Sequence, residues 1–226
     1  RNAIDARLSM GLPNTPMSGS DISVVSGNFV TGMPLGILDG VDMQYSGKVR
    51  AINAQAIDKL LDQHIVLLSN IGYSKSGELF NLPAEELACE MAIALQAEKL
   101  IFFNHDFIRH PLTDQFSTAE CEAFLQQPEL PESLSPLLKL AIKAVKQRVE
   151  RVHIIDENLD GGLLQELFTR DGAGTLHVDR PAHAASQHDR LADRLDVDVV
   201  APQDRSELAL DLGERVADAH VHDRGR

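Results

Sequence analysis

The chain has 226 residues, two cysteines and a formal net charge of −13 at pH 7. This length suits one large domain or two small ones, and two cysteines cannot form a disulfide framework, which is typical of the reducing cytoplasm. The negative charge argues against a nucleic-acid or anionic-membrane partner because phosphates would be repelled, and no apolar run reaches the ~18 residues of a transmembrane helix.

The composition divides the chain into two segments. All eight Phe and both Tyr lie at or before Phe168, whereas residues 176–226 are rich in Asp, Arg and His. A segment without aromatic residues or Ile lacks the side chains that build a core. We therefore expect a domain over residues 1–175 and an atypical tail over residues 176–226 that is poorly ordered or translated out of its native frame.

Strands and helices alternate along the first segment. In chain order, the patterns predict strands at 22–25 and 28–31, a helix at 54–61, a strand buried on both faces at 65–68, a hairpin turn at 75–78, a helix capped by Asn81 and running to about 97, a strand at 100–103, helices near 118–127 and at 137–149, a strand at 152–155, a helix at 162–168 and a strand at 175–178. This alternation predicts a layered α/β fold with a largely parallel sheet.

The most informative string, HIIDENLDGGLLQELFTRDGAGT, begins at His153 and ends in a glycine-rich turn. Gly172 permits positive φ and close approach of the backbone to a ligand. Glu166 near His153 can bind a guanidinium through two hydrogen bonds. From spacing alone, a purely structural alternative stays open, in which glycine ends the helix and Glu166 is solvated.

The string resembles the C-terminal signature of arginine-sensitive members of the amino-acid kinase family, which are the acetylglutamate kinases and the bacterial N-acetylglutamate synthases. By this resemblance His153, Glu166 and Gly172 contribute to a feedback site for L-arginine. The segment from Ser74 to Ile101 is similar to the family's stretch that begins with a substrate-binding Asn, and that residue matches Asn81.

Residues 5–36 and 39–52 resemble the synthase branch, so the resemblance covers roughly residues 5–175. It implies a three-layer α/β/α sandwich of the amino-acid kinase type, present as a partial domain. The family's glycine-rich Lys strand would precede Arg1, and no acetyl-CoA-binding turn follows Thr175.

Departures from the kinase pattern favour the synthase branch. The catalytic Lys of the kinases falls on Leu137 when residues are counted back from His153 without a gap, and a family Asp appears as Glu85. Leucine offers no cation to a transferring phosphoryl group. A shift of two residues to Lys139 would restore the kinase interpretation.

The resemblance thus implies a fragment of a cytoplasmic amino-acid N-acetyltransferase of arginine biosynthesis. The whole enzyme would use acetyl-CoA as co-substrate, acetylate L-glutamate by direct attack of its amine with general-base help, and be inhibited by L-arginine. We expect this chain alone to be inactive, to bind no cofactor and to hold no catalytic residue, while self-associating as family members do.

Two alternatives remain. One is an acetylglutamate kinase that uses ATP and Mg²⁺, and the other is a non-catalytic module that senses arginine or oligomerises. The tail histidines lack the cysteines or scaffold of a structural metal site, so no metal is expected. Cys89 is expected to be a small buried hydrophobe, and the row of Lys139, Lys143 and Lys146 a solvated helix face.

Overall fold

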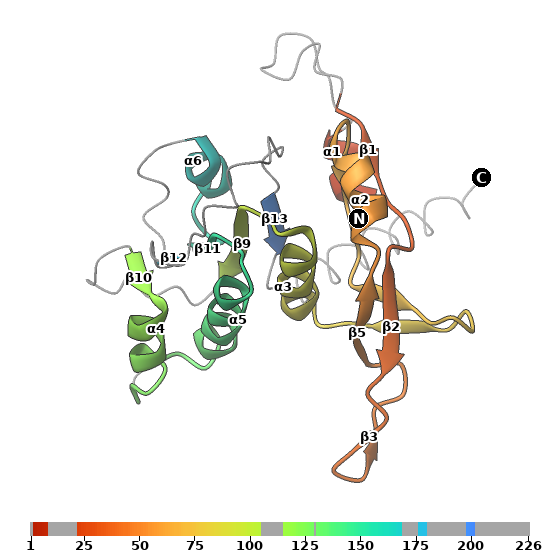
Figure 1. Cartoon of the computed structure of the whole chain (residues 1–226), viewed down its shortest axis with the longest axis horizontal. Helices are drawn as coiled ribbons and strands as arrows, with labels where there is room; N and C mark the ends of the chain where they lie inside the picture. Colours follow the sequence, from red (N-terminus) through yellow and green to blue (C-terminus); the bar gives the residue numbers. More distant parts are fainter. Residues whose placement is uncertain are drawn as a thin grey trace, which may run out of the picture.

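The computed structural model describes residues 2–8, 22–104, 115–128, 130–168, 176–179 and 198–201 (Figure 1). The helices are α1 Asn2–Leu8, α2 Ala54–Leu61, α3 Ala84–Leu95, α4 Thr118–Phe124, α5 Leu134–Lys146 and α6 Gly162–Phe168. The strands are β1 Val24–Val25, β2 Val30–Pro34, β3 Ile37–Leu38, β4 Val41–Asp42, β5 Gly47–Ile52, β6 Ile65–Val66, β7 Ile71–Tyr73, β8 Leu79–Asn81, β9 Lys99–Asn104, β10 Gln115–Ser117, β11 Arg151–Asp156, β12 Leu176–Asp179 and β13 Asp198–Ala201. Within these ranges no helix is both long and apolar enough to span a bilayer.

A five-stranded sheet carries the larger core, in the order β10-β12-β11-β9-β13. All neighbouring strands in it run parallel except β11 and β12, which are antiparallel. The central strands read as continuous apolar runs because both of their faces are covered. The expected alternation of strands and helices around a largely parallel sheet is confirmed.

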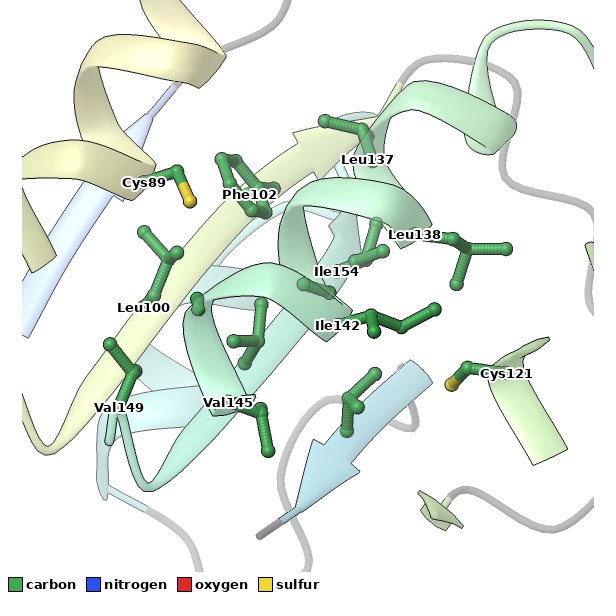
Figure 2. Packing of buried hydrophobic residues seen from close by; sticks show 14 of the residues in the cluster. Cys89, Leu100, Phe102, Cys121, Leu137, Leu138, Ile142, Val145, Val149 and Ile154 are labelled. Atoms are coloured by element: carbon green, nitrogen blue, oxygen red, sulfur yellow. The ribbon is translucent and has the colours of Figure 1, made fainter. Parts of the chain in front are cut away.

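Helix α5 covers one face of this sheet (Figure 2). Every second residue of the central strands points toward it, namely Leu100, Phe102, Val152 and Ile154. Because side chains alternate across a strand, His153 lies on the opposite face. The face that α5 presents is fully apolar, and its buried members are Leu134, Leu137, Leu138, Ala141, Ile142, Ala144 and Val145.

A second sheet, in the order β5-β2-β7-β8, is small and curled. A single β-bridge joins Ser46, just before the edge strand β5, to Asn81, the last residue of the other edge strand β8. The Asn81 N–H donates to the Tyr45 carbonyl at 2.8 Å. Glycines allow two of its neighbouring strands, β2 and β7, to approach closely, since a Cβ on Gly72 would lie 2.8 Å from the Cα of Gly32. This sheet encloses its own small core with Val30, Ile57, Phe80, Leu82, Leu87 and Met91.

Helix α3 lies between the two sheets and belongs to both cores (Figure 1). Leu87 and Met91 pack in the small core, whereas Ala88, Cys89 and Ala92 pack in the large one. Its left-handed C-cap at Gln96 (φ 52°) ends the helix and leads directly into β9.

A two-residue turn joins β3 and β4 in a hairpin that extends away from the body, at the lower end of Figure 1. Asp39 and Gly40 both have positive φ (50° and 81°), which suits the twist of a tight hairpin. The apolar side chains of Ile37 and Val41 are 72% and 62% exposed.

Most of the expected elements are confirmed, and the helices at 54–61 and 162–168 agree residue for residue. The helix expected at 137–149 begins earlier, at Leu134, because Pro136 is tolerated in a first turn, where its missing N–H is not needed. The prediction of a strand buried on both faces at 65–68 is wrong. Among the described residues β6 pairs with β1 alone, and Ile65 is 44% exposed.

The prediction that Asn81 caps the following helix is also wrong. Pro83 occupies the N-cap of α3 without a side-chain hydrogen bond, and Asn81 is the last residue of β8. Hydrogen bonds from the Asn81 N–H to Tyr45 and from the Leu82 N–H to Asn70 keep this part of the chain extended. The expected acidic first turn of the helix, with Glu85 and Glu86, is confirmed.

Two strands of the segment 176–226 lie in the large sheet. Strand β12 confirms the strand expected near residue 175 and buries Val178 completely. Strand β13, which the sequence did not predict, pairs with β9. The domain boundary at residue 175 and the nature of the remaining tail stay predictions.

Candidate functional site

His153 lies in the middle of β11, on the face of the large sheet opposite α5. The flanking Val152 and Ile154 are fully buried, which fixes the strand and therefore the direction of the imidazole. The histidine itself is only 3% exposed.

The short connection after β11 brings Glu166 to this histidine. Asp156 accepts a hydrogen bond from the Asn158 N–H at 2.9 Å, and Gly161 adopts a positive φ of 69°, so the chain turns back into α6. The helix exposes Leu164 and buries Glu166 against the sheet, at 3% exposure.

Glu166 and His153 are in direct contact, between Oε1 of the carboxylate and Nδ1 of the imidazole. Their side chains are 1% and 4% exposed. Burying a carboxylate without a partner is costly, so the contact with His153 explains how α6 can carry Glu166 into a buried position against the sheet.

Lys99 adds a positive charge beside this pair. Its Nζ lies 3.5 Å from the main-chain oxygen of Glu166, in the last turn of α6. A cation there is favourable because the carbonyl groups at a helix C-terminus carry partial negative charge. Lys99 also faces Arg151 across the parallel pair of β9 and β11.

Asn81 lies on a different sheet from the histidine and glutamate. It ends β8, and its side-chain Oδ1 accepts a hydrogen bond of 2.8 Å from the amide of Asn70. The sequence-predicted residues therefore form two separate places, one around His153 and Glu166 and one around Asn81. Gly172 lies outside the described residues.

A model of the amino acid kinase family matches residues 3–156. The chain belongs to the amino acid kinase family. The matched residues include Asn81 and His153 and end before Glu166. A Giardia carbamate kinase, at 12% identity and a TM-score of 0.52 over 72% of this chain, shares the fold alone.

Curated relatives of this family member carry the name amino-acid acetyltransferase. The protein of Pseudomonas fluorescens (strain SBW25) is 45% identical over an alignment of 181 positions, which covers 78% of this chain and 42% of that protein. The protein of Photorhabdus laumondii is 46% identical over 187 residues, covering 77% and 41%. The chain spans about two fifths of the length of these relatives.

Two solved structures agree with these names. N-acetylglutamate synthase from Neisseria gonorrhoeae complexed with coenzyme A and L-arginine has a TM-score of 0.70 at 33% identity, covering 80% of this chain and 43% of that one. The same enzyme complexed with coenzyme A and N-acetyl-glutamate has a TM-score of 0.65 at 35% identity, covering 74% and 40%. These structures show the amino-acid kinase sandwich expected for this chain.

Leu137, which the count back from His153 matched to the kinases' catalytic Lys, is part of the large core. Leu137 is 1% exposed and packs between α5 and the sheet, as Figure 2 shows. Lys139 is exposed on the same helix. A lysine at position 137 would be buried among apolar side chains, so this helix is built for packing there.

The other candidate groups have structural roles in the part of the chain that the structure describes. Burial raises the pKa of the Cys89 thiol to about 11 and that of Cys121 to about 12, so both stay protonated and resemble small hydrophobes, as expected for Cys89. The lysine row is only partly solvated, because Lys143 pairs with Glu90 of α3 and Lys146 with Glu122 of α4. No described cluster of His, Cys, Asp or Glu has the arrangement of a metal site.

Sequence reasoning missed two residues that touch the predicted ones. Lys99 is a basic residue at the first position of an apolar strand, and Asn70 is an amide just after the apolar run 65–68. Each is a polar residue next to an apolar run, at the end of a strand, where side chains of neighbouring strands meet. That signal indicates a place but not a partner, since the partners are distant in sequence.

Proposed function

We propose that this chain is the amino-acid-kinase-type part of an N-acetylglutamate synthase. The whole enzyme would transfer acetyl from acetyl-CoA to L-glutamate, opening arginine biosynthesis in the cytoplasm. The names of the relatives and the coenzyme A, N-acetyl-glutamate and L-arginine bound to the Neisseria gonorrhoeae enzyme support this proposal. The chain itself would hold no catalytic residue for acetyl transfer, and it would self-associate.

The observation that carries the proposal is the buried contact between Glu166 and His153. A carboxylate offers about four lone-pair sites, so a guanidinium can share Glu166 with the imidazole. Because both side chains are almost fully buried, the charge on Glu166 would act with little screening by water. We assign His153, Glu166 and Gly172 to an L-arginine feedback site and Asn81 to the cleft that in the kinases holds the substrate.

The kinase alternative requires a cation where this chain has Leu137. A buried leucine cannot stabilise the charge of a transferring phosphoryl group, and Lys139 points to solvent on another side of α5. Assays on the full-length gene product separate the two enzymes. Release of coenzyme A with glutamate and acetyl-CoA supports the synthase, whereas release of ADP with N-acetylglutamate and ATP would establish the kinase.

Calorimetric titration of the 226-residue chain with L-arginine tests the site itself. Glu166→Gln keeps the shape but removes the charge, and we expect arginine binding to weaken by at least about ten-fold, since hydrogen bonds to charged groups contribute ~1.5–3 kcal/mol. Glu132→Gln, in an exposed turn, is the matched control and should bind as the unchanged chain does. Unchanged binding by Glu166→Gln would refute the site, and binding without turnover by the full-length product would favour a purely sensing module.

A further inference from the structure

Asn70 makes two hydrogen bonds with the same side-chain nitrogen. Its Nδ2 donates to Oδ1 of Asn81 at 2.8 Å and to the main-chain oxygen of Leu82 at 3.2 Å. Its own main-chain oxygen accepts from the Leu82 N–H at 2.8 Å, so the two segments are tied at backbone and side chain together.

These bonds determine which end of each amide points where. The nitrogen and oxygen of an asparagine amide are easily interchanged, and only their partners distinguish them. A main-chain carbonyl can only accept, so the group of Asn70 that faces Leu82 is its NH₂. The group of Asn81 that faces this NH₂ is then its oxygen, and the NH₂ of Asn81 points the other way.

The outward NH₂ of Asn81 meets no acceptor within the described part of the chain, and the residue is exposed. The backbone beneath it is fixed, because the Asn81 N–H donates to Tyr45 and the neighbouring Leu82 is fully buried. The side chain is therefore presented as a donor on a rigid strand end.

We propose that Asn70 is a positioning residue that fixes the polarity of Asn81, so that this place selects a hydrogen-bond acceptor such as a carboxylate or an acyl carbonyl. An ammonium group, which can only donate, is disfavoured there. The inference rests on the proposed function in taking Asn81 as a residue of the cleft. It deepens that proposal by naming the chemical class of the ligand group and the residue that sets it.

Two substitutions of Asn70 separate positioning from simple support of the fold. Asn70→Asp has the same shape but places only acceptors against Leu82 and Asn81, so the amide of Asn81 turns to donate inward and presents its oxygen to the cleft. Asn70→Ala merely frees the amide. With N-acetyl-L-glutamate as the probe, we expect affinity to fall by a few-fold in Asn70→Ala and by about ten-fold or more in Asn70→Asp. A structural role would make the isosteric change the milder one.

Ser69→Asp controls for the added charge. It places a carboxylate one residue earlier in the chain, at an exposed position, and should change affinity by less than about two-fold. An equal loss in Ser69→Asp and Asn70→Asp would show that charge alone weakens binding and would overturn the proposal.

Nuclear magnetic resonance of the side-chain amides reads the polarity without a ligand. We expect slow hydrogen exchange for the NH₂ of Asn70 and fast exchange for that of Asn81, whose resonances shift when N-acetyl-L-glutamate is added. The reverse pattern overturns this inference even if the probe binds. Failure of the unchanged chain to bind the probe, with the expected exchange pattern intact, instead overturns the assignment of Asn81 to a cleft.

Discussion

At the scale of single residues, two side chains stand out because each is polar and almost fully buried. His153 and Glu166 come from a strand and a helix that bury both side chains, and each lowers the cost of burying the other. Such a pair is an expensive way to hold α6 on the sheet, since an apolar pair of similar volume can serve packing as well. This cost is what favours a binding role over a purely structural one.

The energetics of the pair can be tested by breaking it and then replacing it. His153→Phe leaves the buried carboxylate without its imidazole, and we expect the free energy of unfolding to fall by about 3 kcal/mol in urea denaturation. The double change His153→Phe with Glu166→Leu removes the buried charge as well and should recover much of this loss. A double variant as unstable as the sum of both single changes would contradict this account.

Gly72 is the residue that lets the backbones of β7 and β2 approach closely in the small sheet. A Cβ there would lie 2.8 Å from the Cα of Gly32 and 2.9 Å from its nitrogen, which are backbone atoms that cannot rotate away. Gly72→Ala should therefore lower the melting temperature by several degrees, about what a loss of 2 kcal/mol produces in a chain of this size. Gly162→Ala is the control, since its nearest contacts are side-chain atoms of Leu159 at 3.3 Å and it begins a helix. Equal melting temperatures for both variants would contradict the packing argument.

At the scale of elements, local signals predicted much and long-range partners little. The helix at 54–61 was predictable because Ile57, Leu60 and Leu61 share a face, and α6 because glycines and an apolar pattern delimit it. The strand at 65–68 was misjudged because an apolar run does not say how many neighbours a strand has. The prediction that Asn81 caps a helix was wrong because the side chain that binds it, Asn70, lies across a hairpin and is not a neighbour in the sequence.

For the candidate site too, the sequence indicated the residues but not the long-range contact between them. His153 and Glu166 were predicted as a pair through a family resemblance, and their contact is what the structure adds. Spacing alone could not establish it, because a loop of five residues separates β11 from α6 and many loop conformations satisfy that length. The role of β13 was unpredictable for a similar reason, since Asp198–Ala201 has a strand's composition but no sequence signal for the edge it joins.

The start of α4 offers a pH-dependent prediction. Ser117 and Glu120 form a capping box, and the hydrogen bonds from the hydroxyl and then the N–H of Ser117 hold the pKa of the Glu120 carboxyl below its usual value. Because the folded pKa is lowered, the contribution is present above the ordinary glutamate pKa and is lost as the pH falls through the lowered one. Ser117→Ala should raise the pKa of Glu120 toward its ordinary value in a magnetic resonance titration. Ser135→Ala, on α5, should leave that pKa as it is; an equal response to both changes would refute the capping account.

At the scale of the whole molecule, the composition and the structure lead to different views of how far the segment 176–226 belongs to the fold. Its composition sets it apart, yet β12 and β13 flank the central strands of the large sheet. Val178 is fully buried, and Val199 packs against both cores.

Truncation decides between these views. A chain ending at Thr175 loses both strands and uncovers β9 and β11, so we expect its melting temperature to fall by about 5 °C or more. A chain ending at Ala201 keeps both strands and serves as the control, with the melting temperature of the full length. If the chain ending at Thr175 melts as the full length does, the tail is foreign to the fold, and resequencing the gene around Gly174 becomes the decisive step.

Because α3 contributes side chains to both cores, we expect the small core and the large core to unfold together. Loss of the small core would strip Leu87 and Met91 of their neighbours and destabilise the same helix that buries Cys89 against the large sheet. A substitution that destabilises the small core should therefore also loosen the large core. We expect Gly72→Ala, in the small sheet, to speed the reaction of a thiol reagent with Cys121, which lies in the large core beyond α5. Labelling of Cys121 at an unchanged rate would mean that the two cores open as separate cooperative units.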